Sequence, residues 1–325
     1  MTGTPGVALS DDTVFVSYSS FVYGLDATTG SVQWAFPDEA NNQIVFYAPP
    51  LVTEEFVYVG DIANEFHKLD KETGGLVWTF SGAKGYFVGL AAEADGVVYA
   101  PCNDGVLYAL DQNGDMVWKF ETGHYLWAQP QIVGDVIYVS SMDHFVYAIS
   151  TDGEEIWSQE MAGAVVAPPL MSEDASMLYV GSLGGQMVAL GAEDGEIAWN
   201  FESAASVWGN AVMIDDVLYF ADSEGNVYVL DPENGTLSWQ IEVGAAVIGG
   251  LTVFEDGFIL VTEDGVVKAF DAEGTPKWES SPGGEVIQAP VVNEDYVVVG
   301  SIGGDNLVFG FSPTGVQLWS TTPEN

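Results

Sequence analysis

The sequence predicts an all-β fold, an eight-bladed β-propeller of four-stranded antiparallel blades. A tryptophan returns every 39 to 44 residues, always just downstream of a glycine turn. Each interval also holds four short runs in which Val, Ile, Tyr and Phe alternate with polar residues. A period near 40 residues built from strands and turns is typical of propeller blades. The repeated tryptophans are Trp34, Trp78, Trp118, Trp157, Trp199, Trp239, Trp278 and Trp319.

Each repeat predicts strands A to D of one blade. In the second copy the strands are expected at 50–52, 56–60, 66–70 and 76–80, and no segment shows sustained helical periodicity. If 7–9 is strand A of blade 1, the chain forms one domain, 1–325, in which every blade is contiguous and blade 1 meets blade 8 by side-chain packing. The expected blades are 1–36, 45–80, 87–120, 126–159, 165–201, 207–241, 247–280 and 286–321.

The residues before each tryptophan predict a tight turn. They read Asp-x-x-Thr-Gly, or a form one residue shorter in copies 3, 4 and 7. Glycine permits a positive φ, and the Asp side chain can bond neighbouring backbone amides. We therefore expect all eight indoles to dock structurally between adjacent blades.

Charge excludes several classes of partner. The chain has 48 acidic residues, six Lys and no Arg, for a formal net charge of −42. So negative a surface repels nucleic acid and anionic lipid and favours solubility at high salt, as in a halophilic or marine source. No apolar run approaches the roughly 20 residues of a membrane helix, so no membrane insertion by this chain is expected. Residues 1–4 carry no signal-peptide pattern.

Strand order assigns each connection to one of two faces. The A–B and C–D turns form what we call the turn face, and the B–C and D–A loops form the funnel face. Thirty of the 48 acids fall on the turn face. We interpret them as solvated turn residues whose paired carboxylates can collect Ca²⁺ loosely. No twelve-residue loop with the EF-hand pattern occurs, so no dedicated calcium site of that kind is expected. No other cofactor is expected.

The funnel face differs because it carries aromatic side chains. The candidate partner-binding residues are Tyr47, Phe87, His124, Tyr125, Trp127, His144 and Trp208, with Phe46 and Tyr86 beside them. One residue per blade should ring the central channel at the entrance to strand A, namely Thr4, Tyr47, Val88, Trp127, Val166, Trp208, Ile248 and Gln288. Two interpretations stay open: these side chains bind a protein or small ligand, or they fill the wide channel as core.

Metal-binding and catalytic patterns are sparse. The sequence predicts no dedicated metal site. The weak candidates are Cys102, His124, Asp143 and His144, with Asp104 nearby, on adjacent funnel-face loops. The favoured interpretation is that these are independent loop residues, with Cys102 a small buried hydrophobe. No catalytic residue is predicted.

The unit Ala-x-Asp-x-x-Thr-Gly-x-x-x-Trp resembles the tryptophan-docking motif of the quinoprotein-type, or PQQ-like, propeller repeat family, and it covers the whole chain. That family includes PQQ-dependent dehydrogenases, the outer-membrane assembly lipoprotein of the BamB type and sensor domains of bacterial kinases. The resemblance implies an extracytoplasmic location, whether periplasmic, cell-surface or secreted. Such a motif is specific for fold rather than activity.

The enzymatic branch of the family fits this chain poorly. The resemblance to its dehydrogenases would imply neighbouring cysteines in a disulfide and cationic residues for the cofactor carboxylates. This chain has one cysteine and no Arg, and its nearest cation to the funnel face is Lys84. We therefore predict a non-catalytic, exported binding or scaffold module close to the BamB-type branch. The alternative is a quinoprotein-type enzyme with its site in the central funnel around Tyr47, Trp127 and Trp208.

Overall fold

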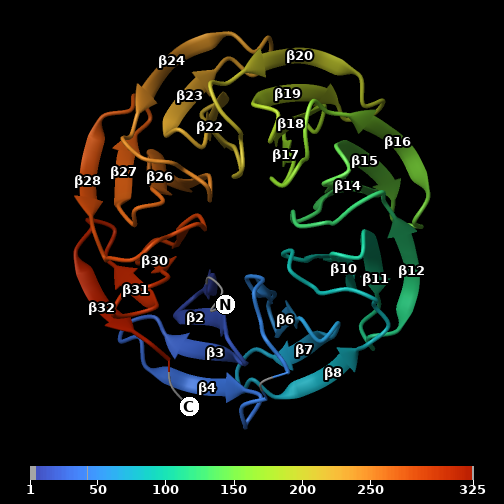
Figure 1. Cartoon of the computed structure of the whole chain (residues 1–325), viewed down its shortest axis with the longest axis vertical. Coiled ribbons are helices and arrows are strands. Elements are labelled where there is room, and N and C mark those ends of the chain that lie inside the picture. The colour runs from blue at the N-terminus through green and yellow to red at the C-terminus, as the bar shows by residue number, and fades with distance from the viewer. Residues whose placement is uncertain (1–4, 42, 324–325) are drawn as a thin grey trace.

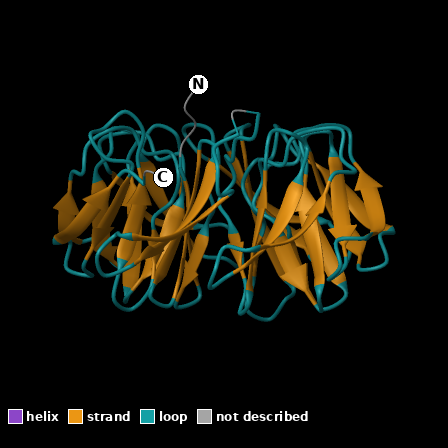
Figure 2. Ribbon diagram, turned by 90° about the horizontal axis from the view of Figure 1, so that it is seen from below, coloured by secondary structure: helices purple, strands orange, loops and turns teal. Residues whose placement is uncertain are grey.

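The computed structural model describes residues 5–41 and 43–323, and it is an eight-bladed propeller (Figure 1). Eight four-stranded sheets surround a central axis, and each sheet consists of four strands consecutive in sequence. The side view shows strands running between two rims of loops (Figure 2). Within the described residues, no helix is long and apolar enough to cross a membrane. The predicted fold class and blade number are confirmed.

The strands follow the predicted order within each blade. The innermost A strands are β1 (Gly6–Ser10), β5 (Leu51–Val52), β9 (Ala92–Ala94), β13 (Gln131–Val133), β17 (Leu170–Met171), β21 (Val212–Ile214), β25 (Leu251–Phe254) and β29 (Val291–Val292). The B strands are β2 (Thr13–Tyr18), β6 (Phe56–Gly60), β10 (Val97–Pro101), β14 (Val136–Ser140), β18 (Met177–Ser182), β22 (Val217–Ala221), β26 (Gly257–Val261) and β30 (Val297–Gly300).

The two outer strands of each blade carry the docking motif. The C strands are β3 (Phe21–Asp26), β7 (Phe66–Asp70), β11 (Val106–Leu110), β15 (Phe145–Ser150), β19 (Gln186–Gly191), β23 (Asn226–Leu230), β27 (Val267–Asp271) and β31 (Val308–Phe311). The outermost D strands are β4 (Val32–Phe36), β8 (Leu76–Phe80), β12 (Met116–Glu121), β16 (Glu155–Glu160), β20 (Ile197–Glu202), β24 (Leu237–Glu242), β28 (Pro276–Ser280) and β32 (Gln317–Thr321).

Hydrophobic packing between blades holds the ring together. The B and C strands are buried almost throughout, because each lies between two neighbouring sheets. The described residues form eight apolar clusters, and every cluster joins two adjacent blades. A blade therefore cannot bury its faces alone, and stability comes from neighbour contacts.

The repeated tryptophans lie at these junctions. In seven of the eight, the indole Nε1 donates to a backbone carbonyl in the C–D turn of the next blade, as from Trp157 to Ala192 at 3.0 Å. For Trp239 the corresponding carbonyl, Ala272, instead accepts from the Tyr219 hydroxyl at 2.9 Å. Every blade also has a register shift beside the tryptophan's strand C partner.

The docking turn departs from the predicted pattern in two respects. Besides copies 3, 4 and 7, copy 8 also has the shorter turn. Its Gly315 amide donates to the carbonyl of Ser312, so one residue fewer separates donor and acceptor than in the long form. The Asp position is held by Ser150, Gly191 and Ser312 in copies 4, 5 and 8. In two of these turns the serine hydroxyl replaces the carboxylate and accepts a hydrogen bond from a backbone amide. In copy 5 the side chain of Asp194 accepts such a bond instead.

The ring closes by side chains. The Trp319 Nε1 donates to the Ala27 carbonyl at 2.6 Å, and an apolar cluster joins blades 8 and 1. Two hydrogen bonds reinforce the seam, from Asn293 to the Asp11 carbonyl at 3.0 Å and between Thr28 and Tyr296 at 3.1 Å. Among residues 5–41 and 43–323, no strand of blade 1 pairs with a strand of blade 8.

Candidate functional site

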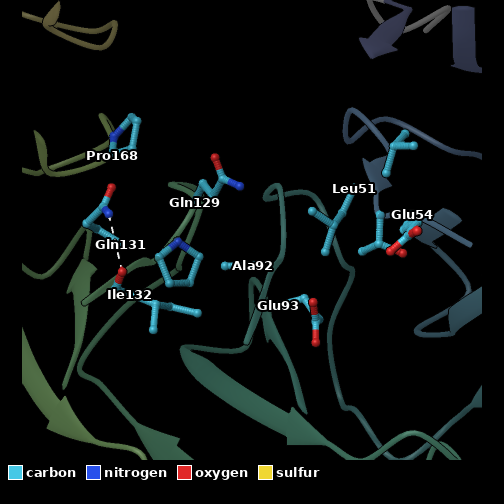
Figure 3. A pocket seen from close by; sticks show the side chains of 11 residues that line it. Leu51, Glu54, Ala92, Glu93, Gln129, Gln131, Ile132 and Pro168 are labelled. Carbon is cyan, nitrogen blue, oxygen red and sulfur yellow. Dashed lines mark hydrogen bonds between the residues drawn. The ribbon is translucent and has the colours of Figure 1, made fainter. Parts of the chain in front are cut away.

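The central channel is lined by the innermost strands. Two adjoining pockets of about 500 Å³ and 450 Å³ share Leu51 and Val52 of β5. The larger pocket is lined by Glu54 and Glu93 on one side and by Gln129 on the other (Figure 3). The lining of both pockets comes from A strands and the residues beside them, and it includes none of the predicted aromatic site residues.

Backbone hydrogen bonds fix the loops of the funnel face. Each D–A loop bonds to the B–C turns of two adjacent blades: the Phe87 amide donates to Asp61 of blade 2, and the Tyr86 carbonyl accepts from Asn103 of blade 3. The loop containing Tyr125 and Leu126 repeats this pattern with Met142 and Cys102. These loops are therefore held in place before any partner arrives, which lowers the entropy cost of binding.

Four large aromatic side chains stay exposed on this fixed surface. The exposed fraction is 46% for Tyr86, 43% for Tyr125, 42% for Trp127 and 37% for Trp208. Tyr86, Tyr125 and Trp127 come from the D–A loops that enter blades 3 and 4, whereas Trp208 lies before blade 6. These four side chains are not part of a packed core. The interpretation that they fill the channel as core is therefore wrong for them.

The remaining predicted site residues differ in their accessibility. His124 and His144 are exposed, and the His124 ring lies 4.3 Å from that of Tyr125. Tyr47 is half-buried. Phe87 is only 1% exposed, because its ring packs with those of Phe66 and Tyr108 between blades 2 and 3. Phe87 therefore belongs to the core and is removed from the candidate site.

The predicted channel ring needs one correction. Strand registers make Val52 and Val292 equivalent, since they pair with Val57 and Val297. Counting back from these residues aligns Tyr47 with Ile287, which is 39% exposed, rather than with Gln288. The one-residue error arose because the sequence alignment relied on the aromatic residue of strand B, and blade 8 has Val298 at the position of Tyr58. Thr4 lies outside the described residues.

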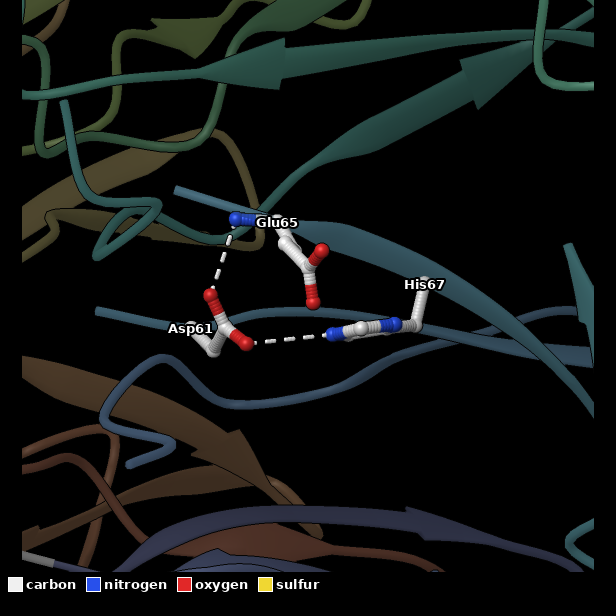
Figure 4. Close-up of side chains that lie close together, drawn as sticks. All are labelled: Asp61, Glu65 and His67. Atoms are coloured by element: carbon white, nitrogen blue, oxygen red, sulfur yellow. Dashed lines mark hydrogen bonds and ion pairs between the residues drawn. The ribbon is translucent and has the colours of Figure 1, made fainter. Parts of the chain in front are cut away.

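The weak metal candidates do not assemble into a site. Cys102 is fully buried, and burial raises the pKa of its thiol, so the thiolate that binds metal is disfavoured. Among the described residues, one group of three His, Cys, Asp or Glu side chains has its ligand atoms within 4.8 Å of one another, and it contains none of these candidates. That group is Asp61, Glu65 and His67 (Figure 4).

Asp104 and Asp143 have a structural role instead. The Asp143 carboxylate accepts from the Tyr147 hydroxyl at 2.8 Å and from the Gly123 amide of the preceding loop at 2.6 Å. Asp104 makes the equivalent bonds with the Tyr108 hydroxyl and the Lys84 amide at 2.8 and 3.0 Å. We call each set an Asp–Tyr clasp. Burial, followed by the bonded carboxylate, raises the pKa of both tyrosines.

Sequence comparison identifies the family. The family profile described as "Outer membrane protein assembly factor BamB" matches residues 1–122, 103–248 and 244–325, which together span the chain. The chain belongs to the BamB family. No curated protein matches it.

Solved structures support the same fold for this BamB-family chain. The crystal structure of BamB from Moraxella catarrhalis matches with a TM-score of 0.81 and 18% identity, covering 94% of this chain and 95% of that one. The computationally designed Ika8 protein matches with a TM-score of 0.82 and 16% identity, covering 95% and 96% of the two chains. One match is a natural protein and the other a designed one, so the likeness establishes architecture rather than activity.

Proposed function

We propose that this BamB-family chain is a non-catalytic scaffold, exported from the cytoplasm, that binds a protein partner through its funnel face. The observation that carries the proposal is the exposure of four large aromatic rings on loops fixed by backbone hydrogen bonds. Tyr and Trp supply a large contact area at little conformational cost and are enriched where partners bind tightly. The family description, an outer-membrane assembly factor, supports both a protein partner and export.

A protein partner is favoured over a small ligand because the aromatic rings lie outside the channel pockets. A quinone-dependent enzyme is disfavoured by charge. Its anionic cofactor would enter a chain of net charge −42 that has no Arg, and the one cysteine is buried. The turn face is an unfavourable docking surface, because its many carboxylates resist desolvation.

The test begins with a partner identified by pull-down and then purified. Replacing Trp127 and Trp208 together by Ala should weaken its binding by at least about thirtyfold, because a buried aromatic anchor contributes about 2 kcal/mol or more. The dissociation constant is measured by calorimetry, and circular dichroism checks the fold. The matched control replaces Val117 and Leu318, exposed apolar residues of the outer D strands, by Ala.

The control variant should bind like the wild type. The assignment of the funnel face is wrong if the double Trp variant folds and binds normally while charge reversal of Glu54 and Glu55, or of Asp215 and Asp216, disrupts the complex. Those four acids lie on the turn face.

A further inference from the structure

A cluster of ligand-type side chains lies beneath the funnel face in blade 2. Asp61 directly follows β6, Glu65 directly precedes β7, and His67 is the second residue of β7. Asp61 is fully buried and His67 is 3% exposed, whereas Glu65 is partly open to solvent. Figure 4 shows the three side chains pointing toward one another. The sequence analysis missed this cluster because the pairing of β7 with β6 is what places the His67 side chain beside the turn that joins the two strands.

Blade 6 provides an internal comparison. Its B–C turn has the same length, and Asp222, Asn226 and Tyr228 occupy the positions of Asp61, Glu65 and His67. In both turns one carboxylate oxygen accepts the same two backbone amides. In blade 6 the side-chain amide of Asn226 and the hydroxyl of Tyr228 also donate to the Asp222 carboxylate, at 2.9 Å each. That set is complete without any ion.

Blade 2 lacks those donors. Glu65 replaces the amide with a second carboxylate, and among residues 5–41 and 43–323 no hydrogen bond or ion pair reaches the Glu65 carboxylate. The Asn64 Oδ1 in the same turn is a buried acceptor with no partner. Two carboxylates beside one imidazole leave an excess of negative charge and of acceptors, which a cation would balance.

The donor geometry fits a small dication. The His67 Nε2 lies 3.2 Å from the Asp61 Oδ2. Two ligands bound to zinc at about 2.0–2.1 Å and at the tetrahedral angle lie about 3.3 Å apart. The His67 Nδ1 is 3.0 Å from the Thr79 hydroxyl. If Nδ1 donates this bond, Nε2 is left unprotonated for metal, as in metal sites where an outer partner fixes the tautomer.

We propose that Asp61, Glu65 and His67 bind a divalent transition-metal ion, and that Zn²⁺ fits them best. One imidazole nitrogen and two carboxylate oxygens are ligands that zinc accepts, with water completing the coordination. Partly exposed Glu65 gives the ion a route from solvent. The His67 ring packs against Phe36 and Phe46, with centroids 5.6 and 5.9 Å away. The metal would therefore stiffen the junction of blades 1 and 2.

The experiment compares three proteins after removal of metal with a chelator. They are the wild type, the swap variant Glu65→Asn with His67→Tyr, and a control with Glu54→Gln and Glu55→Gln. The swap copies blade 6, where Tyr228 already packs on Phe201 as His67 packs on Phe36, so it should fold. Each protein is titrated with Zn²⁺ at high NaCl concentration, which screens weak binding to exposed acids. Bound zinc is counted after dialysis, and the melting temperature is recorded.

Wild type and control should each retain one zinc per chain and melt at a higher temperature with zinc present. The swap variant should retain none and show no shift. Equal retention by wild type and swap, or none by wild type, overturns the proposal and leaves a hydrogen-bonded Asp–His pair. X-ray absorption on the zinc-loaded wild type is independent of the variants. It should show one imidazole among oxygen ligands, and a shell without imidazole also overturns the proposal.

Discussion

At each blade junction, a glycine decides how closely the neighbouring indole can approach. Gly195 has a φ of 71°, and a Cβ placed there would lie 2.6 Å from the Trp157 ring. Gly235 has nearly the same φ and the same 2.6 Å approach to Trp199. The glycine is therefore required twice, for the left-handed backbone and for the space that the indole occupies.

Substitution at Gly195 separates these two requirements. Gly96 provides the control because it has a φ of 79° but no atom within 4 Å of an added Cβ. Gly96→Ala should cost about 1 kcal/mol of unfolding free energy from backbone strain alone. Gly195→Ala should cost about 2 kcal/mol more, because the indole must shift in a packed junction. Urea unfolding measures both, and equal costs would show that indole packing does not depend on the glycine.

Lys68 is an exception among the strand C partners of the docking tryptophans. Most blades have Gly or Ala at this position, including Gly24, Ala109 and Ala148. The Lys68 side chain is 5% exposed, and its Nζ lies 3.6 Å from the centre of the Phe56 ring. Burial lowers its pKa, while Glu55 and Glu93 act in the opposite direction. The ring face of Phe56 partly replaces the water that the ammonium group loses.

At the scale of elements, the two Asp–Tyr clasps join the B–C turns of blades 3 and 4 to the D–A loops before them. The hydroxyls of Tyr108 and Tyr147 donate into carboxylates that also hold loop amides. Ionising either tyrosine would remove the donor and place two negative charges together. The clasps therefore make the funnel face sensitive to alkaline pH.

Stability should fall as pH rises above about 10, the ordinary tyrosine pKa. Burial raises the pKa of Tyr58 and Tyr228 to about 12, and it also raises those of Tyr108 and Tyr147. The unfolded chain then loses these protons first, so unfolding is favoured from pH 10 upward. Replacing Tyr108 and Tyr147 by Phe should cost about 1–3 kcal/mol each at neutral pH and make the alkaline loss shallower.

Chemical unfolding at several pH values tests this expectation. The control is Tyr125→Phe, an exposed side chain on the same face, which should change neither the neutral stability nor the alkaline loss. An alkaline loss that is equally steep in the double Phe variant would show that the clasp tyrosines do not cause it.

At the scale of the whole molecule, charge opposes the packing between blades. Thirty of the 48 acids occupy the turn face, and several hold their own turns, as Asp26 does by accepting from the amides of Thr28 and Thr29. Few cations compensate them. Lys277 pairs with Glu255 and Asp256, and Lys71 with Asp11 at 3.3 Å. The remaining repulsion acts across the whole ring.

The melting temperature should therefore rise between about 0.1 M and about 2 M NaCl, because salt screens this repulsion. Differential scanning calorimetry measures the change. A variant with Glu54 and Glu55 changed to Gln, and Asp215 and Asp216 changed to Asn, should respond less to salt, since it has fewer charges to screen. A melting temperature that is flat or falls in the wild type would contradict the expectation, and with it the prediction of a high-salt source.

The sequence by itself determined the fold, because the repeat is local. A turn, a glycine and a tryptophan at a fixed spacing define one blade, and eight such copies define the ring whatever fills the channel. It also placed Trp127 and Trp208 on the funnel face, since strand order alone assigns loops to faces. Exposure was decided only by tertiary structure: Tyr86 and Phe87 are adjacent aromatic residues of one loop, yet Phe87 packs between blades and Tyr86 is exposed to solvent. The cluster of Asp61, Glu65 and His67 likewise depends on the register that folds β7 back under its turn. Burial and convergence depend on contacts between chain segments, which a local pattern does not encode.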